Sequence, residues 1–519
     1  MSKKVLLIIL DGWGEGQANF SNPIHVAKTP TFDFLRKNFP FFLLQASGIS
    51  VGLPWTEVGN GEVGHLTIGT GRVYYQDYPR VTLAIKSGDF LKNKTLELVL
   101  DHAKKNQSRV HLVGLLTKDI INAAFDHIVA LIDFFQKNNF DNFYLHLFLD
   151  GRDSPSQSGF ELVEKIKKVL AEKGAGKIAS LIGRSYAMDK NEDWEIRTER
   201  AFNLIVDGIG RKITDLNKYF EQIYSDYDFN DSNLEPILIE PDGIIQNNDS
   251  VFFFNFRADG MVQLASAFID PKFNHFPRPD RANLLIASMT KYFDQIDYPV
   301  AFPPEKVNIQ ISRIISEHGL KQIKLAEKVK TAHITYFFNG FYDTPHPNEF
   351  WKIFPAAEKN LDEQPLMQSE IIVRSVIELL NEDDYDFIAA NLAAPDIVAH
   401  TGDFNLGVQV AEGTDRLITL IFEKILTKPN WTMLLTADHG NLEKMINTKT
   451  GKKDTGHNSA PVPTYIVSAD LEKENSTLEI NRANKEIIGT LTDIAPTILS
   501  LMNLAIPDEM KGQNLLGLR

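Results

Sequence analysis

The stretch VLLIILDGWG, residues 5–14, places six consecutive apolar residues directly before an aspartate and a glycine. A run this short and this continuously apolar is typical of a strand buried on both faces of a parallel sheet. It is too short for the apolar segment of a secretory signal peptide, and it ends in a charge at Asp11. The stretch therefore predicts a first strand at Val5–Leu10, with Asp11 at its carboxyl end.

Further apolar runs of similar length follow along the chain. They lie at Val110–Leu116, Phe143–Leu149, Ile178–Ile182, Val251–Phe254, Phe387–Asn391 and Thr432–Thr436. Amphipathic helices are predicted between them, for example in FELVEKIKKVLAEKG (160–174) and from Ser369 onward. This alternation predicts an α/β fold with helices covering both faces of the sheet.

The length of the chain predicts more than one domain. Its 519 residues exceed what one hydrophobic core usually serves. The pattern breaks at YYQDYPR (74–80), and DYPVAFPPEK (297–306) carries three prolines and resembles a linker. We therefore expect an inserted domain at 77–306 and a discontinuous outer domain built from 1–76 and 307–519.

Composition excludes several classes of protein. The net charge of −14 argues against a nucleic-acid binder, which would show a basic face. No apolar run approaches the roughly 18 residues that span a bilayer. The absence of cysteine excludes disulfides and thiolate metal sites. We expect a cytoplasmic protein that acts as a monomer on a small molecule, with no nucleic-acid or membrane partner.

Acidic side chains follow three of the predicted strands, as Asp11, Asp396 and Asp438. Ligands of open parallel sheets bind at the carboxyl ends of strands, and three carboxylates meeting there repel one another unless cations neutralise them. Histidines lie near these aspartates or in later loops, at His400, His439 and His457. One such residue alone is more often a helix cap or a surface residue. Together they predict a metal site, and mixed His/Asp ligation suits Mn²⁺ or Zn²⁺ better than Mg²⁺.

Eight motifs give the chain a resemblance to a known family. They are LDGWG, GNGEVGHLTIGTGR, FLDGRDSP, IGRSYAMDK, NFRADG, AAPDIVAHTG, TADHGN and TGHNSAPVP. In this order and spacing they resemble the cofactor-independent (2,3-bisphosphoglycerate-independent) phosphoglycerate mutases of the alkaline-phosphatase superfamily. The resemblance covers essentially the whole chain. It implies an alkaline-phosphatase-like three-layer α/β domain with a parallel-rich sheet, which binds metal, and an inserted α/β transferase domain, which binds substrate.

The resemblance also implies roles for individual residues. It assigns one metal ion to Asp11, Asp438 and His439, and the other to Asp396, His400 and His457. The implied contacts to the substrate are Asn122, Arg152, Asp153, Arg184, Lys190 and Arg257. Lys330 is implied to act in catalysis, where an ammonium group near metal-bound oxygens stabilises transition-state charge. The implied cofactors are two divalent ions, Mn²⁺ before Zn²⁺ or Mg²⁺. The implied reaction is the interconversion of 3-phosphoglycerate and 2-phosphoglycerate in glycolysis.

The sequence departs from the family at the nucleophile. The family carries a serine in its Gly-Asn-Ser-Glu-Val-Gly-His pattern, and this chain has Gly61 there, without a side chain to accept a phosphoryl group. A family histidine is replaced by Asn122, and two arginines are replaced by Lys190 and Gly260. The metal set is complete, whereas the nucleophile and part of the substrate set are changed. The residues therefore argue against efficient mutase turnover.

Four explanations of Gly61 remain open at the level of sequence. The substitution could be an engineered trap, although that leaves the other three changes unexplained. A hydroxyl of Thr67 or Thr70 could replace the serine if the loop were rethreaded. The chain could be a non-catalytic ligand-binding or regulatory relic. It could also be a two-metal phosphohydrolase on another small phosphate ester, in which hydroxide takes the place of the serine.

Overall fold

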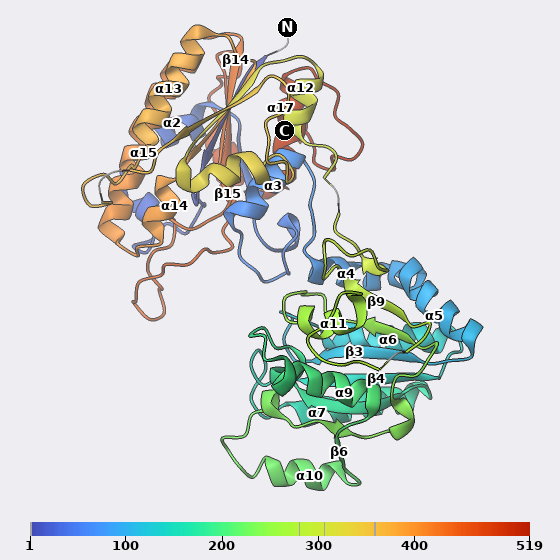
Figure 1. Cartoon of the computed structure of the whole chain (residues 1–519). Helices are drawn as coiled ribbons and strands as arrows, with labels where there is room; N and C mark the ends of the chain where they lie inside the picture. Colours follow the sequence, from blue (N-terminus) through green and yellow to red (C-terminus); the bar gives the residue numbers. More distant parts are fainter. Residues whose placement is uncertain (1–2, 280, 306, 358–359, 519) are drawn as a thin grey trace. The chain divides into compact units, whose positions relative to one another are not determined.

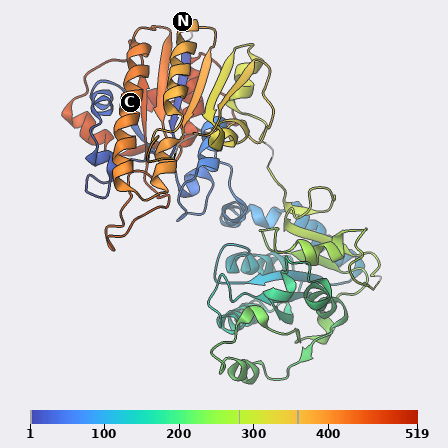
Figure 2. The same ribbon diagram turned by 60° about the vertical axis from the view of Figure 1, so that its left-hand side comes forward.

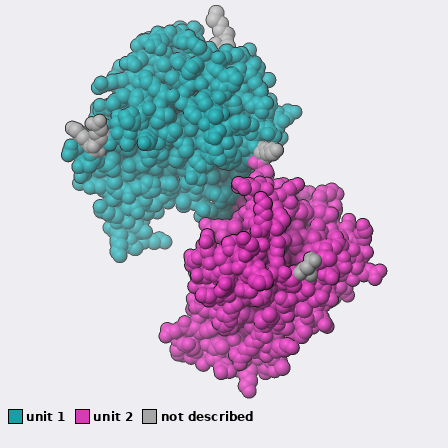
Figure 3. Space-filling model, viewed as in Figure 1, with its two compact units in different colours: residues 1–76, 306–519 teal, residues 77–305 magenta. Residues whose placement is uncertain are grey.

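The computed structural model describes residues 3–279, 281–305, 307–357 and 360–518. The chain divides into two compact units (Figure 3). Unit 1 comprises Met1–Gln76 and Lys306–Arg519, and unit 2 comprises Asp77–Glu305. Each unit has its own hydrophobic core around one mixed sheet.

The sheet of unit 1 has the order β12-β11-β13-β1-β14-β15-β2-β16. Its strands are β1 (Lys4–Leu10), β2 (Phe41–Gln45), β11 (Gln322–Glu327), β12 (Glu349–Phe354), β13 (Phe387–Leu392), β14 (Trp431–Thr436), β15 (Val462–Val467) and β16 (Ile487–Thr490). All neighbouring pairs are parallel except the two pairs made by β15. The central strands β1, β13 and β14 are almost wholly buried, which explains their continuous apolar sequences.

Helices cover both faces of this sheet (Figures 1 and 2). The helices of unit 1 are α1 (Pro23–Val26), α2 (Pro30–Asn38), α3 (Gly61–Thr70), α12 (Ile311–Glu317), α13 (Ser369–Glu382), α14 (Ala394–Ala399), α15 (Phe404–Leu426), α16 (Thr477–Ala483) and α17 (Ile494–Leu501). Helix α15 packs against α1, α2, α13 and α14 on one side of the sheet, and α3 packs against α12 and α17 on the other. Unit 1 is thus a three-layer α/β domain.

Helix α3 is the element that the glycine-rich stretch forms. The Asn60 side chain caps its start by accepting a hydrogen bond from Val63 N at 3.2 Å. Gly71 ends the helix in a left-handed conformation, with φ of 62°, which a residue without Cβ adopts at little cost. Nearly every residue between these caps is buried. The stretch is therefore a packed helix whose first residue is Gly61, and only its preceding turn is a loop.

The sheet of unit 2 has the order β10-β9-β8-β3-β4-β5-β7-β6. Its strands are β3 (Val110–Leu116), β4 (Phe143–Leu149), β5 (Lys177–Gly183), β6 (Arg211–Lys212), β7 (Ile237–Leu238), β8 (Ser250–Phe253), β9 (Leu285–Thr290) and β10 (Val300–Phe302). Its helices are α4 (Asp77–Ser87), α5 (Lys94–Asn106), α6 (Phe125–Lys137), α7 (Gly159–Lys173), α8 (Arg184–Ala187), α9 (Glu199–Asp207), α10 (Leu216–Ile223) and α11 (Val262–Ile269). Strands β3, β4, β5 and β8 are mutually parallel, so their carboxyl ends share one edge.

The fold class expected from the sequence is confirmed. All seven apolar runs are strands, and the two quoted helical segments are α7 and α13. The sequence analysis did not predict the remaining strands, among them β2, β11, β12 and β15. Within the part of the chain that the structure describes, no helix has the length and apolarity needed to cross a membrane.

Candidate metal centre and anion-binding cluster

Three aspartates meet at the carboxyl edge of the unit 1 sheet. Asp11 directly follows β1, and Asp438 lies two residues beyond the end of β14. Asp396 lies in the first turn of α14, just after β13. All three are buried. Because β1 is hydrogen-bonded to both β13 and β14 in parallel register, the three loops emerge side by side.

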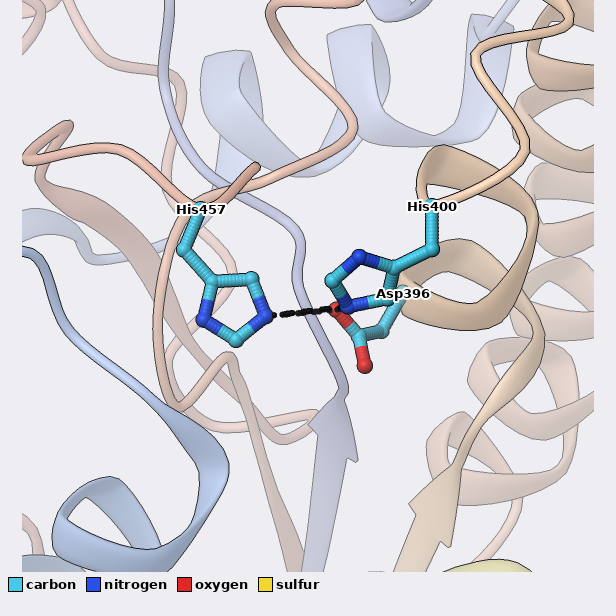
Figure 4. Close-up of side chains that lie close together, drawn as sticks. All are labelled: Asp396, His400 and His457. Carbon is cyan, nitrogen blue, oxygen red and sulfur yellow. Dashed lines mark hydrogen bonds and ion pairs between the residues drawn. The ribbon is translucent and has the colours of Figure 1, made fainter. Parts of the chain in front are cut away.

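His400 and His457 point at the same oxygen of Asp396 (Figure 4). Each Nε2 lies 3.4 Å from Asp396 Oδ1, and the two Nε2 atoms are 3.1 Å apart. His400 Nδ1 is 2.9 Å from Thr455 O, and His457 Nδ1 is 3.0 Å from Gly59 O. Because carbonyl oxygens only accept, each Nδ1 carries a hydrogen, and the Nε2 lone pairs of neutral rings face one another. Three such donor atoms around one point fit a divalent cation.

His439 lies close to the other two aspartates, Asp11 and Asp438. Its Nε2 lies 3.5 Å from Asp11 Oδ1, 3.7 Å from Asp438 Oδ2 and 4.0 Å from Asp396 Oδ1. Burial alone would lower the pKa of His439, but the surrounding carboxylates, led by Asp438, raise it to about 9. Both His439 Nε2 and Asp438 Oδ2 are buried without a hydrogen-bond partner. Buried polar atoms left without a partner in this way fit a bound cation, which would replace the proton of His439 and neutralise Asp438.

The ammonium group of Lys330 places one positive charge of the protein itself among these carboxylates. Its Nζ donates to Asp11 Oδ1 at 2.7 Å and to Asp396 Oδ2 at 2.8 Å. Burial opposes the charge on Lys330, but the negative charges of Asp11, Asp396 and Asp438 raise its pKa above the ordinary value. Burial would raise the pKa of Asp396, but the hydrogen bonds to His400 and His457 lower it. The charge of Lys330 lowers it further. The expected ligand residues and Lys330 thus form one cluster.

Two residues that the sequence analysis did not single out hold this cluster in place. His65 Nδ1 lies 2.8 Å from Gly61 O and 3.1 Å from Asp438 Oδ2. Asn391 Nδ2 donates to Asp11 Oδ2 at 2.7 Å and lies 3.1 Å from His65 Nε2. Both ring nitrogens of His65 are therefore engaged, so this residue positions Asp438 from the side. Their signal in the sequence was weak, since His65 lies one helical turn after Gly61 and Asn391 inside a buried strand.

Gly61 lies at the rim of the same cluster. A Cβ built on it would be 3.4 Å from Asp438 Oδ2, 2.5 Å from His333 Cδ2 and 2.7 Å from His333 Nε2. Burial, with His65 and Lys330 adding to it, lowers the pKa of His333 to about 4. His333 lies three residues after Lys330, but nothing in its sequence context predicted a place beside Gly61.

Neither threonine of α3 takes the place of the missing serine. Thr67 lies six residues along α3 from Gly61, about 9 Å along a helix axis. Thr70 is further along, and its hydroxyl donates to Leu66 O at 2.6 Å. The alternative in which one of these hydroxyls replaces the serine therefore has no geometric support.

The substrate residues expected from the resemblance form a second cluster, in unit 2. Arg184 Nη1 donates to Asp150 Oδ1 at 2.5 Å and to Asp153 Oδ2 at 2.6 Å. Asn122 Nδ2 donates to the same Asp153 oxygen at 2.7 Å. Arg152 is exposed, and its Nη2 donates to the Ser185 hydroxyl at 3.3 Å. These residues follow the ends of β3, β4 and β5 at one edge of the sheet.

Lys190 and Arg257 complete this second cluster. Lys190 Nζ donates to Asp259 Oδ2 at 2.6 Å, and Arg257 Nε lies 3.3 Å from Asp259 Oδ1. The backbone N–H of Arg257 donates to Asn122 O at 3.3 Å, which ties this pair to the first group. Burial would raise the pKa of Asp259, but Lys190 and then Arg257 lower it. A cluster with four cationic groups, two of them the exposed arginines Arg152 and Arg257, suits a small anion.

The fold and the clusters define a class of protein. It is a two-unit α/β protein whose carboxylate–histidine centre is suited to divalent cations and whose second unit presents arginine and lysine side chains. Residues 81–294 match the family model described as BPG-independent PGAM N-terminus. The 2,3-bisphosphoglycerate-independent phosphoglycerate mutase of Clostridium beijerinckii is 39% identical, over 99% of this chain and 99% of its own. That of Clostridium novyi is 40% identical, over 99% of this chain and 100% of its own. A Leishmania mexicana phosphoglycerate mutase structure matches with a TM-score of 0.53 and 28% identity, over 99% of this chain and 98% of its own.

The chain therefore belongs to the 2,3-bisphosphoglycerate-independent phosphoglycerate mutase family.

Proposed function

We propose that this chain binds two divalent metal ions in unit 1 and acts there on a small phosphate ester of the phosphoglycerate type. The observation that carries the proposal is the convergence of His400 and His457 on Asp396, with both Nδ1 hydrogens held by backbone carbonyls. The Leishmania mexicana relative is described at low cobalt concentration, which is consistent with a divalent ion in the family.

The proposed ligands divide into two sets. Asp11, Asp438 and His439 hold one ion, and Asp396, His400 and His457 hold the other. Mixed nitrogen and oxygen donors favour Mn²⁺, with Zn²⁺ and Mg²⁺ as alternatives. Bound ions of this kind neutralise phosphoryl oxygens and lower the pKa of an attacking hydroxyl.

The proposed roles of the two units differ. Unit 1 is the metal-binding phosphatase-like domain, and its Lys330 stabilises the negative charge of the transferring group. Unit 2 is the substrate-binding transferase domain. There Arg152, Arg184 and Arg257 bind the phosphate and carboxylate groups bidentately, while Lys190, Asn122 and Asp153 orient the glycerate.

The proposed reaction is the interconversion of 3-phosphoglycerate and 2-phosphoglycerate in the cytoplasm, by a monomeric enzyme. One observation favours a second candidate. Gly61 offers no side chain beside Asp438, so transfer to water in place of a serine would give a metal-dependent phosphohydrolase.

Phosphorus NMR of 3-phosphoglycerate incubated with the protein, with and without Mn²⁺, tests both candidates. Formation of 2-phosphoglycerate supports the mutase, and formation of inorganic phosphate supports the hydrolase. His400→Ala should abolish either product, whereas His25→Ala, which removes an exposed histidine elsewhere in unit 1, should not. A protein that holds two Mn²⁺ ions and leaves the ester unchanged would refute both reactions.

A further inference from the structure

The imidazole of His333 occupies the space that a side chain at position 61 would need. A Cβ on Gly61 would be 2.5 Å from His333 Cδ2 and 2.7 Å from Nε2, closer than non-bonded carbon atoms approach. The same point is 3.4 Å from Asp438 Oδ2. A nitrogen of His333 is therefore adjacent to the site from which a serine side chain would reach the carboxylate cluster.

The segment that carries His333 also carries Lys330. Lys330 ends a short 3₁₀ turn, η6 (Lys328–Lys330), and a single π-helical turn, η7 (His333–Phe337), begins three residues later. π-Helical turns occur frequently at functional sites. Because Lys330 Nζ bonds both Asp11 and Asp396, this segment is anchored to the cluster. The His333 ring meets the His65 ring edge-on, with centroids 5.4 Å apart.

The His333 ring is chemically available. Its Nδ1 is buried without a hydrogen-bond partner, so no bond at that atom forces the hydrogen onto Nε2. Burial, with His65 and the Lys330 ammonium group adding to it, lowers the pKa of His333 to about 4, which leaves the ring neutral near pH 7. A neutral imidazole nitrogen with a free lone pair is a nucleophile toward phosphorus.

We propose that His333 Nε2 accepts the phosphoryl group in this chain, in place of the serine that is absent from position 61. This inference rests on the proposed function, because it names the residue through which a phosphoglycerate would be processed. It adds a catalytic residue that the resemblance does not supply. It also makes isomerisation compatible with Gly61.

The transfer balances in two steps. The Nε2 lone pair forms a bond to phosphorus while the ester P–O bond breaks, and the glycerate oxygen keeps the electron pair and takes a proton from water. In the second step the other glycerate hydroxyl attacks the phosphorus, releases its proton to water, and the P–N bond breaks with its pair returning to Nε2. If water is the acceptor in the second step, the product is inorganic phosphate.

Other candidate acceptors near the cluster are less suitable. The Thr70 hydroxyl is committed to Leu66 O. Lys330 has a raised pKa and bonds two carboxylates, so its nitrogen has no lone pair to offer. His65 has both ring nitrogens engaged.

The test uses the intact protein, Mn²⁺ and 3-phosphoglycerate labelled with ³²P. Samples are quenched in alkali within one turnover, because a phosphorus–nitrogen bond survives alkali and is lost in acid. Peptide mapping should place an acid-labile label on the peptide that contains His333. Label on Thr67 or Thr70, or consumption of the ester without any labelled protein, would overturn the inference.

A variant separates this inference from the proposed function. His333→Gln should lower ester consumption roughly 10³-fold or more, as removal of a nucleophile does, while still binding two Mn²⁺ ions. His25→Gln serves as the matched control. Unchanged consumption by His333→Gln would refute the role of His333 alone. Absence of consumption by the unaltered protein would refute the proposed function as well.

Discussion

The Nε2 atoms of His400 and His457 lie 3.1 Å apart, and each is 3.4 Å from the same oxygen of Asp396. Their Nδ1 hydrogens are held by backbone carbonyls, that of His400 by Thr455 in the loop that carries His457, and that of His457 by Gly59. Neutral rings in this arrangement present two lone pairs to one another and to a carboxylate. The bond to Asp396 raises the pKa of His400, so a proton relieves the repulsion when no cation is present.

Removal of His457 should therefore weaken the binding of one ion selectively. The His457→Ala protein is expected to bind one Mn²⁺ with unchanged affinity and the second at least about 10-fold more weakly, because one of three protein ligands is lost. Isothermal titration calorimetry and elemental analysis give both values. His318→Ala, in the same unit, should retain two full sites, and two unchanged ions in His457→Ala would contradict the ligand assignment.

Metal loading should also stabilise the unaltered protein. Binding to the folded state alone adds about 2.7 kcal/mol to the free energy of unfolding at a free-ion concentration 100 times the Kd. A rise in Tm with Mn²⁺ that disappears on chelation would show this linkage. A Tm that is independent of the ion would place the cation outside this buried cluster.

Lys330→Met should separate metal binding from turnover. The ammonium group competes with cations for Asp11 and Asp396, so its removal should leave Mn²⁺ affinity unchanged or higher. Turnover should fall roughly 10²-fold or more, because the charge that stabilises the transferring group is lost. Lys328→Met, at an exposed position two residues earlier, is the matched control. A Lys330→Met protein that turns over normally would exclude the residue from catalysis.

The sequence predicted the central strands of both sheets from their apolar runs, but it missed other strands that are also buried, such as β2 and β15. Strand β11, QIKLAE, buries Lys324, which pairs with Glu349 at 2.8 Å on the neighbouring strand β12. Lys324 interrupts the apolar residues of β11, and β12 is an edge strand in which Glu349 alone is fully buried, so neither strand has a continuous apolar run. A lysine such as Lys324 can be buried because a carboxylate from another segment of the chain pairs with it, and the sequence of β11 alone does not show that partner.

The candidate site could likewise be predicted from the sequence only in part. Asp11 and Asp438 could be placed together from sequence because parallel strands bring their carboxyl ends to one edge. The closeness of His333 to Gly61 could not be predicted from sequence. It depends on how η7 packs against α3, which is a tertiary contact between segments about 270 residues apart in the sequence.

Arg184 and Arg152 should differ in how much each contributes to the stability of unit 2 and to ligand binding. Arg184 is buried against Asp150, so Arg184→Gln should lower the free energy of unfolding by about 3 kcal/mol through an unpaired buried carboxylate. Arg152 is exposed, and Arg152→Gln should leave stability within about 0.5 kcal/mol while weakening 3-phosphoglycerate binding. Urea unfolding and ligand titration measure the two effects. Equal stability losses in the two variants would contradict this division.

Acid should destabilise unit 2 through His127. Burial lowers the pKa of this histidine from 6.5 to about 4. Because the folded pKa is the lower one, the stability it contributes is present above pH 6.5 and is lost as the pH falls toward 4. Between pH 7 and pH 5 the loss is about 2 kcal/mol. His127→Gln should remove that part of the pH dependence in urea titrations, and a slope identical to that of the unaltered protein would show that another group is responsible.

Restoring a serine at position 61 should give only partial mutase activity. The new Cβ requires His333 to move, since the two would otherwise lie 2.5 Å apart. The changes at Asn122, Lys190 and Gly260 remain, and each removes a proton donor, a bidentate contact or a charge. Gly61→Ser is therefore expected to stay roughly 100-fold below a Clostridium relative assayed in parallel. Adding Asn122→His, Lys190→Arg and Gly260→Arg should raise the rate further, and a Cβ at Gly260 displaces only the end of a methionine side chain. Full activity from the single serine would mean that these three positions do not limit the reaction, and that Gly61 alone separates this chain from its relatives.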